Sequence, residues 1–407
     1  MARELQKIVV MGLGYIGLPT ASMLATKGHT VLGVDINESA VNTINSGHIH
    51  IVEPDLDLLV RSAVNSGNLR ASLTPEEADT FILAVPTPFK SENGNPKAPD
   101  LSHIEAAAHA IAPYLRAENL VILESTSPVG TTEVVENIIR TLRPDLAGRV
   151  HTAHCPERVL PGQILRELVD NDRIIGGTTK AAIVKARTLY KTFCNGAILE
   201  TDSRTAELSK LVENSFRDVN IAFANELSLI CDRLDINVWE TIALANRHPR
   251  VNILQPGPGV GGHCIAVDPW FIVSSAPEES RLIRTAREVN DAKPEWVLNK
   301  VRCKAARFKD PVIGCLGITF KANIDDLRES PAMDITQSLI HANIGEVMVC
   351  DPNVAHNKVS FPLYDLKEVI KKSDILLLLV DHHEFTEIDF EIIKDKVVID
   401  TKGVFRK

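Results

Sequence analysis

Apolar runs rich in Val, Ile and Leu alternate with helical patterns through the first half of this 407-residue chain, and this alternation constrains its fold most. Strands that alternate with helices form a mostly parallel, doubly wound sheet, so we predict an α/β fold for this half. The candidate strands are Lys7–Met11, Thr30–Val34, Thr80–Val85, Leu120–Glu124, Val150–Ala153 and Arg173–Ile175, and the candidate helices are Ile16–Lys27, Ser39–Ser46, Ser102–Leu115, Thr131–Leu142 and Lys180–Phe193.

The alternation stops near Thr201, and one long helix without Pro or Gly is predicted over Ser203–Asp235. Its apolar residues recur at helical spacing, which favours a buried face or a subunit interface. They are Leu208, Leu211, Val212, Phe216, Val219, Phe223, Leu227 and Ile230. Two further helical stretches, Val238–Asn246 and Glu279–Arg307, lie on either side of a glycine-rich loop.

A second series of strands follows Pro311. We expect them at Val312–Leu316, Glu346–Cys350, Ile375–Val380 and Val397–Asp400. A helix is expected to begin at Ser330-Pro331, because Ser suits the N-cap and Pro the first helical position. We therefore divide the chain into three domains: 1–200, 201–308 and 309–407.

Composition excludes several classes of protein. The net charge of −9 gives no general attraction for nucleic acid, and no basic stripe is visible. No apolar stretch approaches the roughly 18 residues of a membrane span, so we expect no membrane segment. The seven cysteines are scattered without CxxC pairs, which fits a reducing, cytoplasmic location.

The first motif is Gly12-Leu13-Gly14-Tyr15-Ile16-Gly17, between a strand and a helix. In a dinucleotide fingerprint the first glycine permits a tight turn, the second admits the pyrophosphate at the helix N-terminus, and the third lets helix and strand pack closely. Asp35 ends the next strand, 18 residues after Gly17. A carboxylate there accepts ribose hydroxyls and repels a 2′-phosphate, which predicts NAD over NADP.

The second motif places Cys264 after a glycine-rich run, Pro256-Gly257-Pro258-Gly259-Val260-Gly261-Gly262-His263. Amide groups aimed at the sulfur would lower the pKa of its thiol and favour a nucleophilic thiolate. Asp268, four residues on, is a candidate for activating water. The residues His263, Cys264 and Asp268 lack structural zinc spacing, so we predict no metal. The other six cysteines are expected to be buried and inert: Cys155, Cys194, Cys231, Cys303, Cys315 and Cys350.

Polar residues elsewhere suggest catalysis with less specificity. Lys210 and Asn214 lie four residues apart on the long helix, either as an oxyanion-stabilising pair or as part of a solvated face. Glu157 follows a strand end, where it could handle a proton or simply lie at the surface. The upstream segment Glu124-Ser125-Thr126-Ser127-Pro128 also ends a strand.

Taken in order, these motifs resemble the UDP-glucose/UDP-N-acetylmannosamine dehydrogenase family. The resemblance covers the whole chain and rests on GLGYIGLP, ESTSPVGTT, CPERVLPGQ, ELSKLVENSFRDVNIAFANEL, GPGVGGHCIAVDPWF and GITFKANIDDLRESPA. It implies an N-terminal Rossmann domain for NAD, a central helical dimerisation region and a C-terminal Rossmann-like domain for the UDP-sugar. Family members oxidise sugar C6 twice, from alcohol to acid, without releasing the aldehyde.

The resemblance also implies roles for single residues. Cys264 matches the nucleophile that forms a thiohemiacetal and then a thioester, and Asp268 matches the aspartate near it. Lys210 and Asn214 match the oxyanion-stabilising pair, and Glu157 matches the glutamate linked to proton handling and hydrolysis. Thr126 matches the threonine that positions a water or the nicotinamide end. The expected NAD contacts are Gly12, Gly14, Tyr15, Ile16, Gly17, Asp35, Pro86, Thr87 and Thr126. The expected substrate contacts are Arg158, Val159, Leu160, Lys210, Asn214, Arg250, Asn252, Gly261, His263, Lys321 and Arg328.

Two questions stay open at this point. The segments HCIAVDPWF and NRHPRVNILQPGPG are typical of the branch that oxidises UDP-N-acetyl-D-mannosamine, but UDP-linked N-acetylglucosamine, N-acetylgalactosamine or glucose are alternatives. A non-catalytic NAD- and nucleotide-sugar-binding protein is a further alternative, which the presence of Cys264 and Lys210 disfavours. We expect a homodimer in which Arg250 reaches the neighbouring site.

Overall fold

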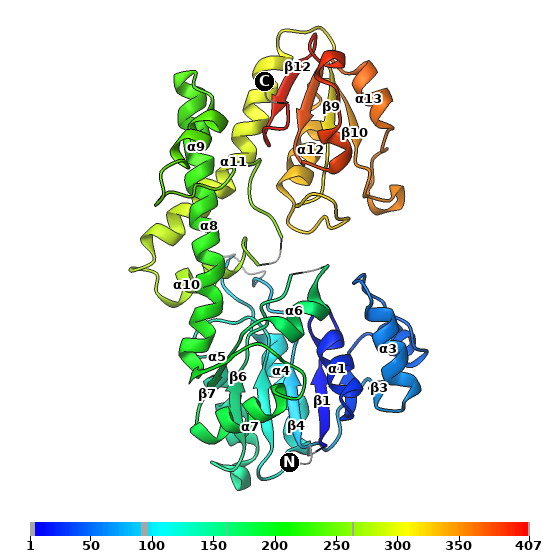
Figure 1. Cartoon of the computed structure of the whole chain (residues 1–407), viewed down its shortest axis with the longest axis vertical. Helices are drawn as coiled ribbons and strands as arrows, with labels where there is room; N and C mark the ends of the chain where they lie inside the picture. Colours follow the sequence, from blue (N-terminus) through cyan, green and yellow to red (C-terminus); the bar gives the residue numbers. More distant parts are fainter. Residues whose placement is uncertain (1–4, 91–96, 161, 263, 406–407) are drawn as a thin grey trace. The chain divides into compact units, whose positions relative to one another are not determined.

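The computed structural model describes residues 5–90, 97–160, 162–262 and 264–405. The chain forms two compact units, one of Met1–Val212 with Trp270–Ser275, the other of Glu213–Pro269 with Ala276–Lys407. Both are α/β, and they are described separately below (Figure 1). None of the helices in the described ranges is both long enough and apolar enough to cross a lipid bilayer.

The first unit contains an eight-stranded sheet of order β3-β2-β1-β4-β5-β6-β7-β8. Its strands are β1 (Lys7–Met11), β2 (Thr30–Val34), β3 (Leu69–Ser72), β4 (Thr80–Leu83), β5 (Leu120–Leu123), β6 (His151–His154), β7 (Arg173–Gly177) and β8 (Ile198–Asp202). The helices are α1 (Gly17–Thr26), α2 (Glu38–Asn45), α3 (Leu56–Asn65), α4 (Ser102–Ile111), α5 (Thr131–Leu142), α6 (Ile164–Asp170) and α7 (Lys180–Tyr190). The predicted parallel α/β domain is confirmed, although the prediction missed β3, β8, α3 and α6.

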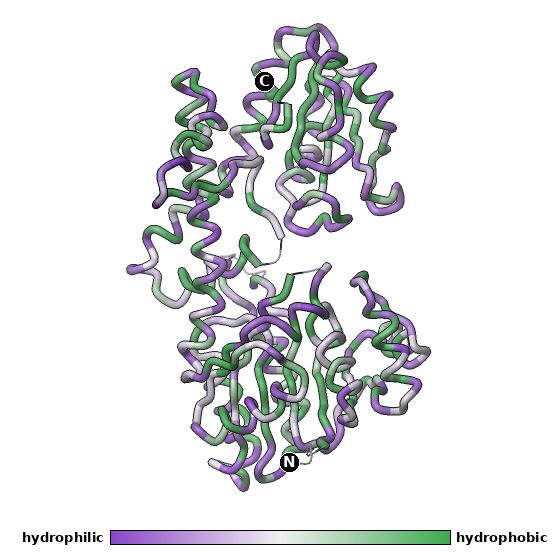
Figure 2. Tube along the Cα trace, in the orientation of Figure 1, coloured by the Kyte–Doolittle hydropathy of each residue, from purple (hydrophilic) through white to green (hydrophobic). Residues whose placement is uncertain are grey.

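Apolar residues on both faces of these strands explain their continuous hydrophobic runs. In β1, Ile8 and Val10 enter one core cluster, whereas Val9 and Met11 enter the cluster on the opposite face. This alternation is the ordinary pleat of a strand that helices cover on both sides. Figure 2 shows the same pattern as apolar colouring along the strands of both sheets.

One strand pair departs from the parallel pattern. The register Ala153↔Gly177 and His154↔Gly176 shows that β7 runs antiparallel to β6. Continued by three residues, this register brings the beginning of β7, Arg173, level with Glu157. The reversal therefore adds a basic residue to the edge at which β5 and β6 end.

The second unit contains long helices and a four-stranded parallel sheet of order β10-β9-β11-β12. Its strands are β9 (Val312–Leu316), β10 (Glu346–Cys350), β11 (Ile375–Leu378) and β12 (Val397–Asp400). Its helices include α9 (Val238–Ala245), α11 (Arg281–Ala305), α12 (Pro331–Ala342), α13 (Leu366–Lys372) and α14 (His383–Thr386), while α8 (Ser203–Leu234) and α10 (Asp268–Ser275) span the unit boundary. Helix α12 begins as predicted, because the Ser330 side chain accepts the Met333 N–H and Pro331 follows it.

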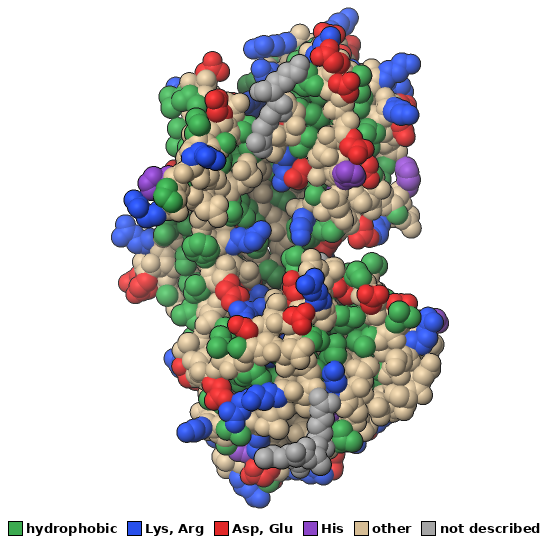
Figure 3. Space-filling view, in the orientation of Figure 1, with side chains coloured by type: hydrophobic (Ala, Val, Ile, Leu, Met, Phe, Trp, Pro, Cys, Tyr) green, Lys and Arg blue, Asp and Glu red, His purple; other side chains and the backbone are tan. Residues whose placement is uncertain are grey.

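The apolar stripe of α8 is partly exposed. Leu211 is buried, but Phe216 is 70% exposed and Phe223 59%, and Leu208, Val212 and Ile230 also reach the surface. The expectation of a face buried within the chain is therefore wrong for most of this stripe. Figure 3 shows apolar side chains at the surface along α8. Exposed apolar patches of this kind mark interaction surfaces.

Candidate active site

The glycine fingerprint forms a turn that no larger residue could make. Gly12 has φ of +89°, and a Cβ on it would lie 2.6 Å from the Ala84 carbonyl oxygen. A Cβ on Gly17 would lie 1.8 Å from the Gly12 carbonyl oxygen. These two glycines are therefore required by the turn and by the packing of α1 on the sheet.

Gly14 differs from the other two, since nothing lies within 4 Å of the position its Cβ would take. The N-cap residue of α1, Ile16, makes no side-chain hydrogen bond to the first N–H groups of the helix. Such a helix start is an anion site that matches a pyrophosphate. The residues present therefore fit the predicted NAD, with Tyr15 and Ile16 half-buried beside the loop.

Asp35 follows β2 and joins the fingerprint loop to it. Its carboxylate accepts hydrogen bonds from the backbone N–H of Leu13 (2.9 Å) and of Asn37 (2.9 Å). The side chain is half-buried, and a carboxylate keeps further lone pairs for ribose hydroxyls. The acid thus also orients the loop that it borders, which the motif alone did not predict.

The loops after β4 and β5 are tied together. The Thr87 hydroxyl donates to the Thr126 carbonyl oxygen at 2.6 Å, and the Ser125 hydroxyl donates to the Val85 carbonyl oxygen at 2.7 Å. Thr87 and Thr126 are half-buried and Pro86 is exposed. The structure thus brings the predicted cofactor residues of these two loops together.

Glu157 lies in a buried ion pair. One of its oxygens accepts from Arg173 at 3.0 Å, and the other accepts from the Arg158 backbone N–H at 2.8 Å. Arg173 also donates to the Cys155 sulfur at 3.7 Å. Burial raises the pKa of the Cys155 thiol to about 12, so this cysteine stays neutral. The alternative of a surface glutamate is excluded by the 8% exposure of Glu157.

Two acids hold the segment that follows Glu157. The Glu53 carboxylate accepts from the N–H groups of Gly162 (2.8 Å) and Ile164 (2.7 Å). Glu167 accepts from the Leu160 N–H at 2.6 Å. Arg158 and Val159 are half-buried and Leu160 is exposed, so this predicted substrate segment is fixed through its backbone.

The first turns of α8 attach to α5. Glu207 accepts from the N–H groups of Gly130 (2.6 Å) and Thr132 (2.7 Å) and from the Thr132 hydroxyl (2.6 Å). It therefore caps α5 from another element, and burial raises the pKa of its carboxyl. Lys210 lies almost one turn later on α8 and is buried, so the alternative of a solvated face is wrong for this residue.

Cys264 lies in a turn that brings it close to two other predicted residues. The N–H groups of Val267 and Asp268 both donate to the Cys264 carbonyl oxygen, at 3.1 and 2.9 Å. Asp268 is buried at the start of α10 and accepts from the Asn214 amide at 2.5 Å. The second unit thus brings Cys264, Asp268 and Asn214 together, and the Cys264 side chain is exposed. His263 lies outside the described residues.

The glycines before Cys264 are required by packing. A Cβ on Gly261 would lie 2.2 Å from the Glu329 carbonyl oxygen, and one on Gly262 would lie 2.9 Å from the Phe320 ring. The Gly257 N–H donates to the buried Asn225 side chain at 2.9 Å. The loop is therefore packed closely onto the segment that carries Lys321 and Arg328, which explains its glycines without a ligand.

A buried Asp–His pair orders the loop that carries Lys321. His382 Nε2 lies 3.1 Å from the Asp351 carboxylate, and His382 Nδ1 accepts the Asn323 N–H at 2.9 Å. Because Nδ1 accepts a backbone proton, Nε2 is the ring nitrogen that can donate to Asp351. Burial opposes ionisation of Asp351, but the bond to His382 lowers the pKa of this carboxyl below its usual value.

The remaining predicted substrate residues lie at the surface. Lys321 and Arg328 are exposed, and Arg328 pairs with Asp326 at 2.6 Å. Arg250 and Asn252 are exposed in the segment after α9. Among the described residues of the second unit, no hydrogen bond joins Arg250 or Asn252 to Cys264.

The cysteine prediction holds for five of the six residues expected to be inert. Cys155, Cys194, Cys231, Cys315 and Cys350 are buried, and burial raises the pKa of Cys315 and of Cys350 to about 12. Cys303 on α11 is exposed, so its predicted burial is wrong.

Sequence reasoning missed Glu53, Glu207, Arg173 and Tyr190. Each contributes through a contact with a residue more than 15 positions away along the chain, and none stands in a local motif. In the sequence, the available signal for them was the presence of polar residues, Glu among them, near the predicted strand ends.

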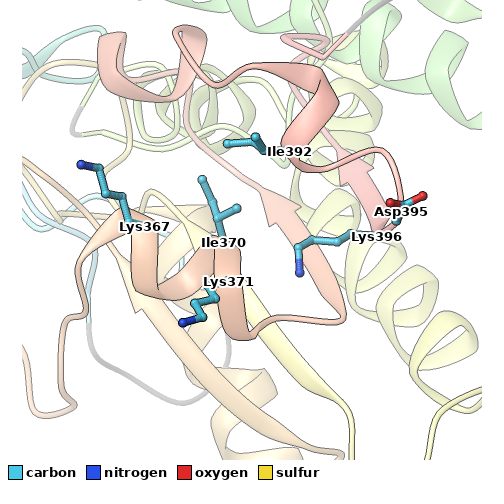
Figure 4. A pocket seen from close by; sticks show the side chains of 6 residues that line it. All are labelled: Lys367, Ile370, Lys371, Ile392, Asp395 and Lys396. Atoms are coloured by element: carbon cyan, nitrogen blue, oxygen red, sulfur yellow. The ribbon is translucent and has the colours of Figure 1, made fainter.

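The C-terminal sheet domain also has a shallow pocket, which lies apart from the candidate site residues of that domain. Figure 4 shows its lining residues, Lys367, Ile370, Lys371, Ile392, Asp395 and Lys396. Three of them belong to α13 and three lie in the segment before β12, and both segments lead into the amino ends of strands, whereas Lys321 follows a carboxyl end. The pocket is therefore not part of the candidate site. Within the described ranges, no group of three or more His, Cys, Asp or Glu residues could hold a metal ion.

Comparison with known families places all three regions in one group. The NAD binding domain of the UDP-glucose/GDP-mannose dehydrogenase family matches residues 6–194, its central domain matches 204–292, and its UDP binding domain matches 314–407. The three domains follow one another along the chain in the order that the sequence motifs predicted.

Individual relatives are similar over nearly the whole chain. An NDP-N-acetyl-D-galactosaminuronic acid dehydrogenase of Ralstonia nicotianae is 58% identical and covers 99% of this chain and 97% of its own. The UDP-N-acetyl-D-mannosamine dehydrogenase of Escherichia coli is 54% identical, with 98% and 99% covered. A solved structure of the UDP-N-acetyl-mannosamine dehydrogenase from S. aureus is 45% identical, with a TM-score of 0.89 over 98% of this chain and 96% of that chain.

Thiol alkylation tests the exposure of the cysteines. We expect iodoacetamide to modify Cys264 and Cys303 in the native protein and the five buried cysteines only after unfolding, because reaction needs an accessible thiolate. Peptide mass spectrometry measures this directly, and Cys303→Ser leaves Cys264 as the one modified residue. Rapid native modification of Cys155, or a Cys264 that reacts no faster than Cys155, contradicts the structure.

Proposed function

The chain belongs to the UDP-glucose/GDP-mannose dehydrogenase family of NAD-dependent nucleotide-sugar dehydrogenases, and we propose that it oxidises C6 of a UDP-linked N-acetylhexosamine twice, from alcohol to carboxylate. One observation supports this most. An exposed thiol, Cys264, is held by a short turn next to the buried Asp268, which in turn bonds Asn214. A non-catalytic binding protein has no need of that arrangement.

NAD bound at the fingerprint supplies the hydride acceptor for both oxidations. The turn of Gly12, the open space over Gly14 and the uncapped α1 would hold its pyrophosphate, and Asp35 would hold its ribose. Thr87 and Thr126, joined by their hydrogen bond, would border its nicotinamide end.

Cys264 would retain the substrate between the two oxidations. Its thiolate adds to the C6 aldehyde and forms a thiohemiacetal, whose oxygen carries the developing negative charge. Lys210 supplies a cation and Asn214 an amide N–H toward that oxygen. Oxidation of the thiohemiacetal leaves a thioester, so the aldehyde is never released.

Water then hydrolyses the thioester and frees the thiol. Glu157 and Asp268 are the carboxylates available to accept the water proton. Glu157 forms an ion pair with Arg173, whereas Asp268 accepts a hydrogen bond from Asn214. We assign the proton transfer to Glu157 and the orientation of Asn214 to Asp268.

The remaining proposed contacts concern the nucleotide and the sugar. Lys321 and Arg250 supply charge for the diphosphate, with Arg328 nearby in sequence. The other proposed substrate contacts are Arg158, Val159, Leu160, Asn252, Gly261 and His263. In this scheme residues 1–200 bind NAD, 201–308 form the dimer, and 309–407 bind UDP.

Two sugar configurations are candidates. UDP-N-acetyl-D-mannosamine is supported by the HCIAVDPWF and NRHPRVNILQPGPG segments and by the similarity to the E. coli and S. aureus enzymes. An N-acetylgalactosamine-configured substrate is supported by the 58% identity to the R. nicotianae protein. We propose UDP-N-acetyl-D-mannosamine, and the galacto sugar is the second candidate.

A panel of UDP-sugars tests the function and the substrate together. We expect NADH formation with UDP-N-acetyl-D-mannosamine, at about two NADH per sugar because alcohol-to-acid oxidation removes four electrons. Absorbance of NADH and mass spectrometry of the product measure this. Cys264→Ala should abolish acid formation, with Cys303→Ala as the matched control that retains it. One NADH per sugar, or activity on UDP-glucose alone, contradicts the proposal.

The exposed stripe of α8 supports the proposed homodimer. Phe216→Glu with Phe223→Glu should convert the dimer to a monomer, because burying two carboxylates in an apolar interface is costly. Size-exclusion chromatography with light scattering measures the mass. Phe308→Glu, at an exposed position after α11, is the control that should remain dimeric. A monomeric wild type, or a double variant that stays dimeric, overturns this interface.

Mixing two inactive variants tests whether Arg250 serves the neighbouring site. Random exchange between Arg250→Ala and Cys264→Ala subunits gives half mixed dimers with one complete site each, so activity should recover to about a quarter of wild type. Each variant alone should stay well below that level. If Arg250 serves its own subunit, no mixed dimer holds a complete site and activity does not recover.

A further inference from the structure

Four polar side chains form a buried cluster where β5 and β6 of the first unit end: Glu124, Glu157, Arg173 and Tyr190. Glu124 is 1% exposed, Arg173 4% and Tyr190 0%. The Tyr190 hydroxyl donates to Glu124 at 2.6 Å, and its ring stacks 4.5 Å from the Arg173 guanidinium. Arg173 in turn pairs with Glu157 at 3.0 Å.

Strand pairing brings these residues together. Glu124 follows β5 and Cys155 follows β6, and the Cys155 N–H donates to the Leu123 carbonyl oxygen at 3.0 Å. Arg173 joins them because β7 is antiparallel to β6. Tyr190 is the last residue of α7, which covers this end of the sheet. The cluster is thus part of the sheet edge that carries the proposed site.

The charges of the cluster do not balance when both acids are ionised. Two carboxylates face one guanidinium, and the Cys155 thiol stays neutral, so a net charge of −1 would be buried. A buried unpaired charge is costly, and a carboxyl group avoids it by keeping its proton. The cluster therefore retains one proton near neutral pH.

The hydrogen-bond donors decide which acid keeps it. Glu157 accepts charge-assisted and backbone hydrogen bonds, from the Arg173 guanidinium and from the Arg158 N–H. Glu124 faces neutral hydroxyl groups, those of Tyr190 and Thr20. We therefore assign the proton of the cluster to Glu124 and not to Glu157.

The titration of Glu124 agrees with this assignment. Burial, and then the charge of Glu157, raise the pKa of Glu124 to about 7, against the opposing effects of Arg173, Tyr190 and Thr20. These groups come from α1, β7, α7 and the segment after β6. Burial alone would lower the pKa of Arg173, but the Glu157 carboxylate raises it, so the guanidinium stays charged.

We propose that Glu124 is a positioning residue of this reaction: it holds the proton of the buried cluster and thereby sets the net charge beside Glu157 when water is activated. This rests on the proposed role of Glu157 in hydrolysis. With Glu124 neutral, Arg173 compensates Glu157 alone. When Glu124 ionises, it adds a negative charge beside Glu157, which favours the transfer of a proton from water toward this pair of acids, and hydrolysis of the thioester accelerates.

Hydrolysis of the pre-formed acyl-enzyme tests this. In the wild type we expect its rate to rise roughly three- to tenfold through a step near pH 7, above the background measured with Glu157→Gln. In Glu124→Gln the step should vanish, because Gln stays neutral, and the rate should remain at the low-pH level. Glu105→Gln, on the exposed face of α4, is the matched control with an unchanged step.

Tyr190→Phe supplies the opposite shift. Its hydroxyl donates to the Glu124 carboxylate, so removing it favours the protonated acid and should move the step upward by about one pH unit. A merely structural role would change the rate at all pH values and leave the midpoint in place. A wild type without a step, a step that persists in Glu124→Gln, or an unmoved midpoint in Tyr190→Phe overturns the proposal.

Protein stability gives a readout that needs no substrate. The pKa of Glu124 is raised from 4.5 to about 7 in the folded protein, so the folded state binds more protons between these values and its stability falls as pH rises through them. Urea unfolding at pH 5 and at pH 8 measures this loss of stability. Between the two pH values, the unfolding equilibrium constant of the wild type should rise by about a hundredfold more than that of Glu124→Gln. Equal pH dependence in both proteins refutes the bound proton. A protein inactive on every UDP-sugar but with this difference would refute the proposed function and leave the proton at Glu124 established.

Discussion

Hydrogen bonding between parallel strands is the interaction on which the candidate site depends. Because β1, β2, β4, β5 and β6 run in one direction, the residues that follow them meet at one edge of the sheet. That edge collects the glycine fingerprint, Asp35, Thr87, Thr126 and Glu157 from five separate stretches of chain. Among the named strands of the described ranges, β6 and β7 form the one antiparallel pair, which adds Arg173 to the same edge, where it pairs with Glu157.

Buried or half-buried acidic side chains also hold loops in place, both in the first unit and in the C-terminal sheet domain. Glu53, Glu207, Asp35 and Asp351 each accept backbone N–H groups of a loop or a helix start. A carboxylate can accept two such bonds at once, and it favours the positive end of a helix, so one side chain fixes several residues of loop. Part of the acidic surplus of the chain therefore serves to order loops.

Local patterns predicted much of this arrangement and long-range contacts the rest. The fingerprint, Ser330-Pro331 and the Cys264 loop are recognisable because glycine, proline and capping residues act on their own immediate backbone. Strand direction has no such local sign, so the reversal of β7 and the Glu157–Arg173 pair were not predicted. The exposed Phe216 and Phe223 show a related limit, since apolar spacing on α8 indicates a covered face but does not tell whether the same chain or a second copy covers it.

Cys155 and Cys264 show how their surroundings give two thiols different reactivity. Cys155 lies beside an arginine, which favours a thiolate, yet complete burial dominates and keeps its thiol neutral. Cys264 lies exposed on a loop whose glycines are packed against Phe320 and Glu329, so the backbone is rigid while the sulfur stays accessible. A thiol that must form and release a covalent bond needs access, whereas groups that only tune a proton are better shielded from water. The roles proposed above match that difference, since Cys264 is exposed whereas Glu124, Arg173 and Tyr190 are buried.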